Sequence, residues 1–209
     1  MYLHHPQFDE MKRYASNGSL GRIRSIHCGF GIPALDNPGF RDKPELGGGA
    51  MLDVGSYATS AVLALVGEEE LRVESARITA SPGSAVDTDG WAVLSTPGGT
   101  IATLEWRINC AYRNELDIWG SEGSVFSDRI FSKPADYVPE FRLRDSKGNE
   151  RRVLGQPADH FRAMLEDFRW TISDPVRAEV ERDRIEARAR LLDRIALAAR
   201  RGADDRPAQ

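Results

Sequence analysis

The segment that most constrains this chain is Gly47-Gly48-Gly49 together with the apolar helix predicted to follow it as far as Val66. Three consecutive glycines give the backbone conformational freedom immediately before the helix. The apolar residues of the helix are Met51, Leu52, Val54, Val62, Leu63, Leu65 and Val66. They leave it little polar surface, so we expect the helix to be mostly buried and the rest of the chain to be organised around it.

Two polar residues interrupt this apolar helix. Asp53 and Tyr57 are four residues apart, so both side chains are predicted to lie on one face. A carboxyl group beside a phenol can hold or relay a proton, which makes the two residues a candidate general acid/base pair. The spacing also allows a buried polar pair that only exchanges a hydrogen bond.

The composition is typical of a globular protein, because 41% of the 209 residues are hydrophobic and 29% are charged. A chain of this length can form one sizeable core, so we expect a single domain over residues 1–202 and a frayed tail over 203–209. The net charge of -4 argues against a nucleic-acid partner. The sequence contains neither a run of about 18 apolar residues nor a secretory signal, so we expect a cytoplasmic protein with no membrane span.

The N-terminal part of the chain predicts a helix, a strand and a long loop. The helix runs from Pro6 to about Asn17, and the strand lies within Gly21–Ile32. The loop over Pro33–Leu46 carries Arg41 to a position just before the glycines. Because binding groups concentrate in loops held by a rigid scaffold, Arg41 is a candidate contact for a substrate hydroxyl or phosphate, and a solvated arginine is the alternative.

Extended runs follow the central helix at regular spacing and predict an antiparallel meander. These runs are Leu71–Ala80, Trp91–Thr96, Thr100–Asn109 and Glu115–Trp119, with a short further piece at 124–126. The three tryptophans of consecutive strands are Trp91, Trp106 and Trp119. Such residues on a water-exposed sheet face are unfavourable unless a second copy covers some of them, so we expect a homo-oligomer formed through the open sheet face.

The C-terminal part predicts a hairpin and two helices. Strands at Phe141–Arg144 and Arg151–Leu154 form the hairpin, and a helix follows from Pro157 to about Ser173. The expected core stripe of that helix is Phe161, Met164, Leu165 and Phe168. His160 in its first turn is either a packing residue or a substrate contact. The last helix is predicted from Asp183 to about Arg201.

Several sequence motifs of catalytic and cofactor sites are absent. The chain has no G-x-S-x-G nucleophile motif and no G-x-x-x-x-G-K-[ST] loop. The triplet Gly47-Gly48-Gly49 lacks the G-x-G-x-x-G spacing of a dinucleotide site. His4 and His5 are adjacent in sequence without a third ligand nearby, so we expect no metal site.

Several segments nevertheless resemble one enzyme family. They are Pro44–Tyr57, Met1–Gln7, Gly18–Ile23, Trp119–Ser124 and Asp159–Phe161. Together they resemble the Gfo/Idh/MocA oxidoreductases, in the branch that includes sugar dehydrogenases, glucose-fructose oxidoreductase and nucleotide-sugar 3-ketoreductases.

The resemblance implies a fold and a division of labour. In that family an N-terminal Rossmann domain binds NAD(H) or NADP(H), and a C-terminal domain carries the substrate pocket and the oligomer interface. This chain resembles the C-terminal domain alone, so the expected fold is α+β, with a large, mainly antiparallel open sheet, helices packed on one face and no Rossmann domain. The family's glycine-rich turn and catalytic lysine segment are missing, so NAD or NADP is not expected to bind this chain alone.

The resemblance also assigns residues. Asp53 matches the family's aspartate, and Tyr57 matches the position whose phenol is the proton donor or acceptor at the reacting carbon's oxygen. Arg41, Arg113 and His160 fall where substrate contacts are expected.

The implied function is the substrate-binding part of an NAD(P)-dependent oxidoreductase that transfers hydride at a carbinol or ketone carbon of a sugar or nucleotide-sugar. Such a part would be inactive without a Rossmann partner, either a separate chain or a half missing from this reading frame. The alternative is a non-catalytic oligomerisation or sugar-binding module that lost cofactor binding.

Overall fold

The computed structural model describes residues 1–67 and 71–204, and the side chains of residues 1–67 and 71–201. In chain order the elements are η1 (Tyr2–His4), α1 (Pro6–Ser16), β1 (Ile23–Ile32), η2 (Pro44–Leu46), η3 (Met51–Gly55), α2 (Ser56–Val66), β2 (Arg72–Thr79), β3 (Asp89–Ser95), β4 (Ile101–Ile108), β5 (Arg113–Gly120), β6 (Gly123–Asp128), β7 (Glu140–Asp145), β8 (Glu150–Leu154), α3 (His160–Thr171) and α4 (Pro175–Asp204). Most of these bounds lie within a few residues of the predicted ones.

The strands form one eight-stranded sheet in the order β2-β3-β4-β1-β5-β6-β7-β8. Every neighbouring pair is antiparallel except β1 and β4, which run parallel. The predicted mainly antiparallel open sheet is therefore confirmed, but the predicted continuous meander is wrong. β1 lies between β4 and β5. The prediction missed this position because strand alternation indicates which face a residue occupies and not which strand lies beside it.

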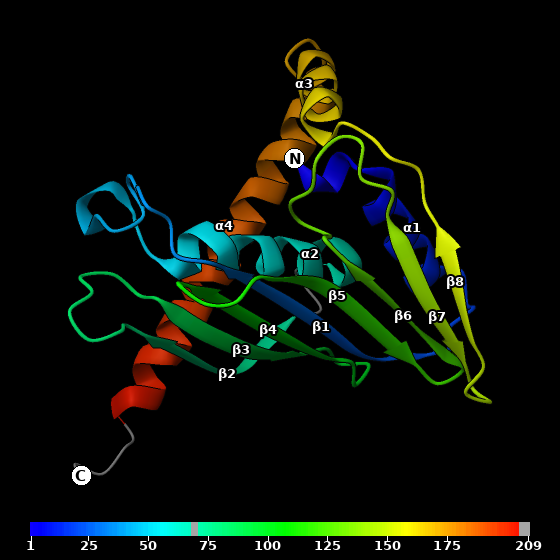
Figure 1. The fold of residues 1–209 in the computed structure, drawn as a ribbon, viewed down its shortest axis with the longest axis horizontal. Helices are drawn as coiled ribbons and strands as arrows, with labels where there is room; N and C mark the ends of the chain where they lie inside the picture. The colour runs from blue at the N-terminus through cyan, green and yellow to red at the C-terminus, as the bar shows by residue number, and fades with distance from the viewer. Residues whose placement is uncertain (68–70, 205–209) are drawn as a thin grey trace.

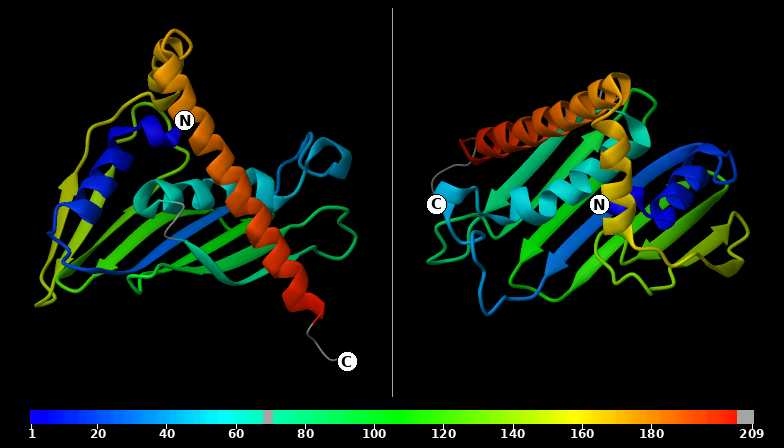
Figure 2. Two further views of the ribbon diagram at one scale, coloured as in Figure 1. Left: turned by 180° about the vertical axis from the view of Figure 1, so that it is seen from behind. Right: turned by 90° about the horizontal axis from the view of Figure 1, so that it is seen from above.

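The helices cover one face of this sheet (Figures 1 and 2). α2 packs on the central strands β1 and β4, and α4 packs along β2 at one edge. α1 lies over the other end of the sheet, where the ring of Tyr14 contacts Phe141 of β7. The chain described here places no helix on the opposite face, which we call the open face.

One of the three tryptophans belongs to the core. Trp106 is 1% exposed on the helix-covered face, whereas Trp91 and Trp119 lie on the open face and are 36% and 60% exposed. The expectation that Trp106 is exposed together with Trp91 and Trp119 is wrong. The alternation of side chains along β4 places Trp106 on the helix-covered face. Gly90 of β3 makes room for the indole, since a Cβ atom there would lie 2.4 Å from the ring.

The helix α1 begins where Pro6 predicts. Pro6 occupies the first turn, and Nδ1 of His5 accepts a hydrogen bond from the backbone N–H of Gln7. A proline is favourable there because its missing N–H would have no partner within the helix. The same bond requires the unprotonated Nδ1 of His5, and burial lowers the pKa of this imidazole to about 4.

The helix α3 is shorter than predicted and is oriented differently. Asp159 caps it by accepting hydrogen bonds from the N–H groups of Phe161 and Arg162, so residues 157–159 stay outside the helix. The predicted core stripe is wrong, because Phe161, Leu165 and Phe168 are exposed. Within the described part of the chain, α3 packs mainly against η1 and α4 and not on a strand of the sheet.

The helix α4 is longer than predicted. It begins at Pro175, where the side chain of Asp174 accepts from the N–H groups of Val176 and Arg177. Its first turns are polar on most sides, so they carry no helical periodicity that the sequence could reveal. α4 includes the first two residues of the predicted tail, and residues 205–209 lie outside the described residues.

The stretch Pro44–Val66, within the described part of the chain, is the one helical stretch long and apolar enough to cross a membrane. Half of its most apolar window is buried inside the fold. Its packing on β1, β4 and α4 accounts for the apolar composition.

Candidate active site at the start of the central helix

The glycine triplet and a distant loop together fix the start of the central helix. Oδ2 of Asp87 accepts a hydrogen bond of 2.7 Å from the N–H of Met51, and the Asp87 carbonyl accepts one of 2.9 Å from Ala50. Gly49 has φ +115°, and a Cβ atom there would lie 2.1 Å from Oδ1 of Asp87. The position therefore requires glycine.

The segment that follows is a π-helix over Met51–Gly55, and α2 continues from it. Such π-turns are rare and occur frequently at functional sites. This one contains Asp53 and ends two residues before Tyr57, so both predicted catalytic residues lie at an irregular part of the backbone.

Arg41 and Asp53 form an ion pair. Nε of Arg41 lies 2.6 Å from Oδ2 of Asp53, and the two side chains are 32% and 15% exposed. The guanidinium also lies over the ring of Phe40, 4.9 Å from its centroid. Arg41 is thus neither fully solvated nor free, because the carboxylate and the ring together fix its orientation.

Tyr57 is half-buried among aromatic rings. Its ring centroid lies 5.2 Å from that of Phe30 and 5.9 Å from those of Tyr2 and Phe131. Its hydroxyl points to Sδ of Met1 at 3.8 Å, so the phenol donates no hydrogen bond to Asp53. Burial, followed by the charge of Asp53, raises the pKa of the phenol, and the charge of Arg41 acts in the opposite direction. The phenol is therefore protonated at neutral pH and able to donate.

A pocket of about 210 Å³ opens next to the ion pair. It is lined by Ile32, Pro33, Leu35, Pro38, Arg41, Asp42, Ser84, Val86, Thr88, Ile108 and Asn109. The lining thus joins the ends of β1 and β4 with the loop that carries Arg41. Six of these eleven residues are apolar, and an apolar cavity with a few converging polar groups is typical of a small-molecule site.

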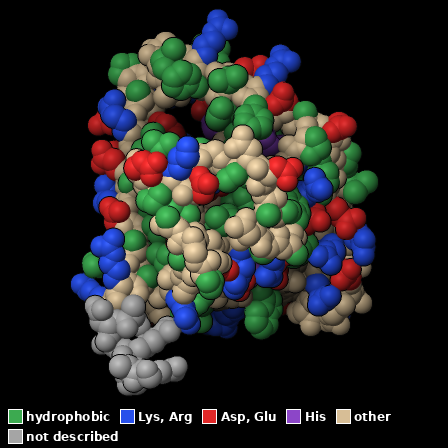
Figure 3. Space-filling view, turned by 60° about the vertical axis from the view of Figure 1, so that its left-hand side comes forward, with side chains coloured by type: hydrophobic (Ala, Val, Ile, Leu, Met, Phe, Trp, Pro, Cys, Tyr) green, Lys and Arg blue, Asp and Glu red, His purple; other side chains and the backbone are tan. Residues whose placement is uncertain are grey.

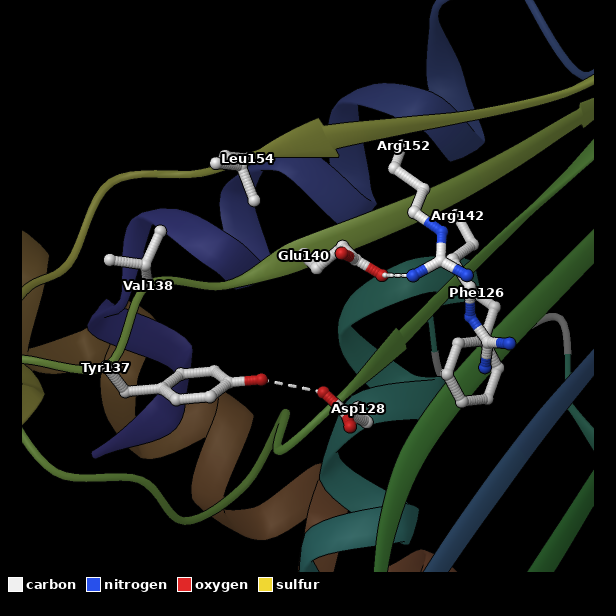
Figure 4. A pocket seen from close by; sticks show the side chains of 8 residues that line it. All are labelled: Phe126, Asp128, Tyr137, Val138, Glu140, Arg142, Arg152 and Leu154. Atoms are coloured by element: carbon white, nitrogen blue, oxygen red, sulfur yellow. Dashed lines mark hydrogen bonds and ion pairs between the residues drawn. The ribbon is translucent and has the colours of Figure 1, made fainter.

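A larger groove, of about 540 Å³, lies on the open face over β6, β7 and β8 (Figure 4). Its polar side chains are paired with one another. Tyr137 donates to Asp128 at 2.7 Å, Arg152 lies 3.3 Å from Glu140, and Arg142 lies over the ring of Phe126. Because this groove is on the opposite side of the sheet from Tyr57, its size does not make it the active site.

Arg113 does not join the predicted site. It is on the open face, 2.5 Å from Glu115 and 3.3 Å from Glu105, and it contacts His27. The alternation of β5 buries Asn114 on the helix-covered side and so turns Arg113 away from it. The structure thus separates Arg113 from Arg41 and Tyr57, and its predicted role as a substrate contact stays a prediction.

His160 is a packing residue in this structure. It is 2% exposed, and its ring lies 5.8 Å from that of His5 and 4.8 Å from that of Phe161. Its Nδ1 atom has no hydrogen-bond partner among the described residues. Burial and the nearby Lys133 lower the pKa of this imidazole. Like Asp53 and Tyr57, the histidine lines neither pocket, and its role as a substrate contact stays a prediction.

Two polar residues near these elements carry no signal in the sequence. Lys133 is buried, its ammonium group donates to the Ile130 carbonyl at 2.8 Å, and burial lowers its pKa to about 7. Asp87 holds the helix start from a loop that is far away in sequence. A lysine before a proline and an aspartate in a loop are ordinary turn residues, so only the folded arrangement reveals them.

The glycine triplet does not form an open cradle for a dinucleotide. The glycine triplet is filled by its own chain, because a Cβ atom on Gly48 would lie 2.6 to 2.8 Å from the carbonyl oxygens of Phe40, Arg41 and Lys43. The residues that the structure describes contain no group of three or more His, Cys, Asp or Glu side chains that could hold a metal ion.

Comparison with known proteins gives a consistent result. Residues 8–126 match the model of the GFO/IDH/MocA C-terminal domain. A dTDP-3,4-didehydro-2,6-dideoxy-alpha-D-glucose 3-reductase of Saccharopolyspora spinosa is 32% identical over 97% of this chain and 62% of its own length. The corresponding reductase of Streptomyces antibioticus is 29% identical over 95% of this chain and 60% of its own length.

A 3-ketoreductase from Actinomadura kijaniata, solved with NADP and TDP-benzene, superimposes with a TM-score of 0.85. It is 27% identical, and the match covers 94% of this chain and 60% of that chain. Solved variants of that enzyme replace a tyrosine by phenylalanine and a lysine by alanine. The chain therefore spans about three fifths of the length of these relatives.

Proposed function

Since the chain belongs to the Gfo/Idh/MocA oxidoreductase family through its C-terminal domain, we propose that it is the substrate-binding part of an NAD(P)-dependent oxidoreductase. The proposed substrate is a sugar or nucleotide-sugar, and the reaction interconverts a ketone and an alcohol. The observation that carries the proposal is the protonated phenol of Tyr57 beside the Arg41–Asp53 ion pair, next to a pocket that Arg41 lines.

Reduction of a ketone adds a hydride to carbon and a proton to oxygen. The residues of this chain act on the proton. As the carbonyl π-bond breaks, Tyr57 gives its hydroxyl proton to the oxygen, and the resulting phenolate recovers a proton from solvent. The positive charge of Arg41 favours that phenolate, whereas Asp53 opposes it and holds Arg41 in place.

The hydride has to come from a cofactor that another domain holds. We propose that a nucleotide-binding half supplies NADPH or NADH, either from the same polypeptide or as a separate chain. The named relatives are longer than this chain, and a structural relative was solved with NADP. We also propose that the protein is cytoplasmic, as expected for an enzyme that uses NADPH or NADH.

We propose that the open face pairs with a second copy of the chain. Trp91 of β3, Ile101 of β4 and Trp119 of β5 are exposed there, and Arg113 and Glu115 of β5 form an ion pair on the same face. Apolar side chains ringed by charged pairs are typical of a protein interface.

Turnover by a completed enzyme tests the proposal. The nucleotide-binding half of the Saccharopolyspora spinosa reductase is fused upstream of the 209-residue chain, and NADPH oxidation is followed with a dTDP-linked 3-keto sugar. We expect turnover by the fusion and none by the chain alone. Absence of both turnover and binding of the dTDP-sugar would refute the proposal.

The second candidate is a sugar-binding module without catalysis. The position of Tyr57 supports it, because the phenol lines neither pocket and its hydroxyl points to Sδ of Met1. Binding of the dTDP-sugar by the fusion, without NADPH oxidation, would support this alternative over the first proposal.

A further inference from the structure

The structure separates two residues that the sequence predicts to share a helix face. At α-helical spacing, Asp53 and Tyr57 would lie one above the other. In the structure the carboxylate pairs with Arg41, and the phenol donates no hydrogen bond to it. The residues Met51–Gly55 form a π-helix, in which each N–H bonds to the fifth residue back rather than the fourth. The extra residue in this turn rotates Tyr57 relative to Asp53.

The start of the π-helix is held by Asp87. Its carboxylate accepts a hydrogen bond of 2.7 Å from the N–H of Met51, and its carbonyl accepts one of 2.9 Å from that of Ala50. Asp87 lies in the loop between the strands β2 and β3. The first residues of the turn are therefore tied to the sheet and cannot adjust with the helix alone.

The end of the π-helix rests on Trp106 of β4. A Cβ atom on Gly55 would lie 3.0 Å from Cδ2 of the indole, so the backbone of the turn meets the ring directly. The indole is 1% exposed and lies over Gly90 of β3. Its Nε1 atom has no hydrogen-bond partner among the described residues, so the indole acts here through its shape. The turn thus spans two fixed points, the Asp87 loop and this ring.

Hydroxyl side chains bond to carbonyl groups along the same segment. Ser56 donates to the carbonyl of Asp53 at 3.1 Å. Thr59 donates to the carbonyl of Gly55 at 2.9 Å. Bonds of this kind compete with the regular hydrogen bonds of a helix and often bend it, so they favour an irregular turn at this place.

The proton on Tyr57 responds to the charges beside it. Burial, followed by the charge of Asp53, raises the pKa of the phenol, and the charge of Arg41 lowers it. Figure 3 shows acidic and basic side chains interspersed over the side of the molecule where the loop after β1 lies, so neighbouring charges rather than a field of one sign act on the phenol. The direction in which the Asp53 carboxylate points therefore decides how readily Tyr57 gives up its proton.

We propose that Trp106 and Asp87 are positioning residues. They hold the π-helix so that the carboxylate of Asp53 faces Arg41 and the hydroxyl of Tyr57 stays free to donate to a substrate. If the segment relaxed to α-helical spacing, the carboxylate would come beside the phenol and accept its hydrogen bond, which would make the phenol a weaker acid. The role toward a substrate rests on the proposed function, whereas the role in holding the turn does not.

Titration of Tyr57 in the 209-residue chain tests the positioning role without turnover. The tyrosines are replaced by fluorotyrosine, which lowers every phenol pKa, and the fluorine NMR signal of Tyr57 is assigned by its loss in Tyr57→Phe. In Trp106→Phe we expect the pKa of this phenol to rise by about one unit, because Asp53 comes beside it. Adding Asp53→Asn should remove the rise. Phe141→Leu is the matched control, since this β7 ring is also 1% exposed, and it should leave the pKa unchanged.

Asp87 provides a second arm, which decides the matter even if Trp106→Phe does not fold. Asp87→Ala removes the acceptor of the Met51 N–H and should raise the pKa of Tyr57 in the same way. Asp87→Asn keeps an acceptor oxygen and should restore the parent value. In the fused enzyme, kcat should fall by about tenfold in Trp106→Phe and in Asp87→Ala with little change in KM, because a weaker acid donates its proton more slowly.

Two results of the titration would overturn the positioning role. One is a phenol pKa that is the same in the parent, Trp106→Phe and Asp87→Ala. The other is a rise that persists when Asp53→Asn is added. A fusion that shows no turnover, although the phenol of the chain shifts as expected, would refute only the proposed function. Equal turnover by the parent fusion and by both positioning variants would refute only the positioning role.

Discussion

Nε of Arg41 lies 2.6 Å from Oδ2 of Asp53, which ties the loop after β1 to the π-helical segment before Tyr57. Because both side chains are at least two thirds buried, their mutual attraction is less screened than that of a surface pair. A double-mutant cycle with Arg41→Ala and Asp53→Ala should give a coupling of about 1 kcal/mol in the free energy of unfolding.

The exposed pair Arg162–Glu166 on α3 is the control for that cycle. Its side chains are 78% and 61% exposed, so solvent screens the pair and the same experiment should give a smaller coupling. A coupling between Arg41 and Asp53 no larger than that of the control would show that the ion pair does not fix the loop.

The buried Lys133 makes stability depend on pH. Burial lowers its pKa from 10.5 to about 7, so between these values the unfolded chain binds more protons than the folded chain. Stability from this group therefore rises with pH through that window, with a slope of at most about 1.4 kcal/mol per pH unit. From pH 7 to pH 9, the free energy of urea unfolding should rise more for the wild type than for Lys133→Met. An equal change in the two proteins would contradict the burial of the lysine.

Gly90 is predicted to be essential for the packing of Trp106. A Cβ atom at Gly90 would lie 2.4 Å from the indole, so Gly90→Ala should destabilise the fold by about 1–3 kcal/mol through overpacking. Gly98→Ala is the control, because the nearest atom to its Cβ would be Oγ1 of Thr96 at 3.7 Å. Equal midpoints of urea unfolding for the two variants would disprove the steric argument.

The open face and the exposed Trp170 of α3 predict different effects on association. Trp119→Glu places a charge on the open face, so sedimentation equilibrium should show a shift toward the monomer mass. Trp170→Glu on α3 should leave the mass of the 209-residue chain unchanged. A reversed result would assign self-association to α3, and a monomeric wild-type chain would remove the proposed oligomer.

Local patterns in the sequence predicted much of the fold. Pro6 located the start of α1, and period-two alternation located most strands, because both signals depend only on nearby residues. The insertion of β1 between β4 and β5 depends on contacts between distant segments, so no local pattern encodes it. The predicted core stripe of α3 is wrong, because periodicity indicates that Phe161, Leu165 and Phe168 share one helix face but not whether that face is buried.

The candidate site was predictable to a similar extent. The spacing of Asp53 and Tyr57 placed both residues at the start of one helix, where the structure has them. Arg41, which pairs with Asp53, and Asp87, which accepts from the N–H of Met51, come from loops, and a loop residue's contact is set by the fold and not by spacing. The face occupied by Arg113 follows from alternation only once the helix-covered side of the sheet is known.

The rate of ketone reduction by Tyr57→Phe in the fused enzyme tests the central claim most directly. Tyr137→Phe on the open face is the matched control, since it removes a phenol hydroxyl that bonds to Asp128. If Tyr57 supplies the proton, kcat should fall by about 10²–10⁴-fold in Tyr57→Phe with little change in KM, while Tyr137→Phe retains the parent rate. Equal rates for the two variants would contradict the role of Tyr57 as proton donor.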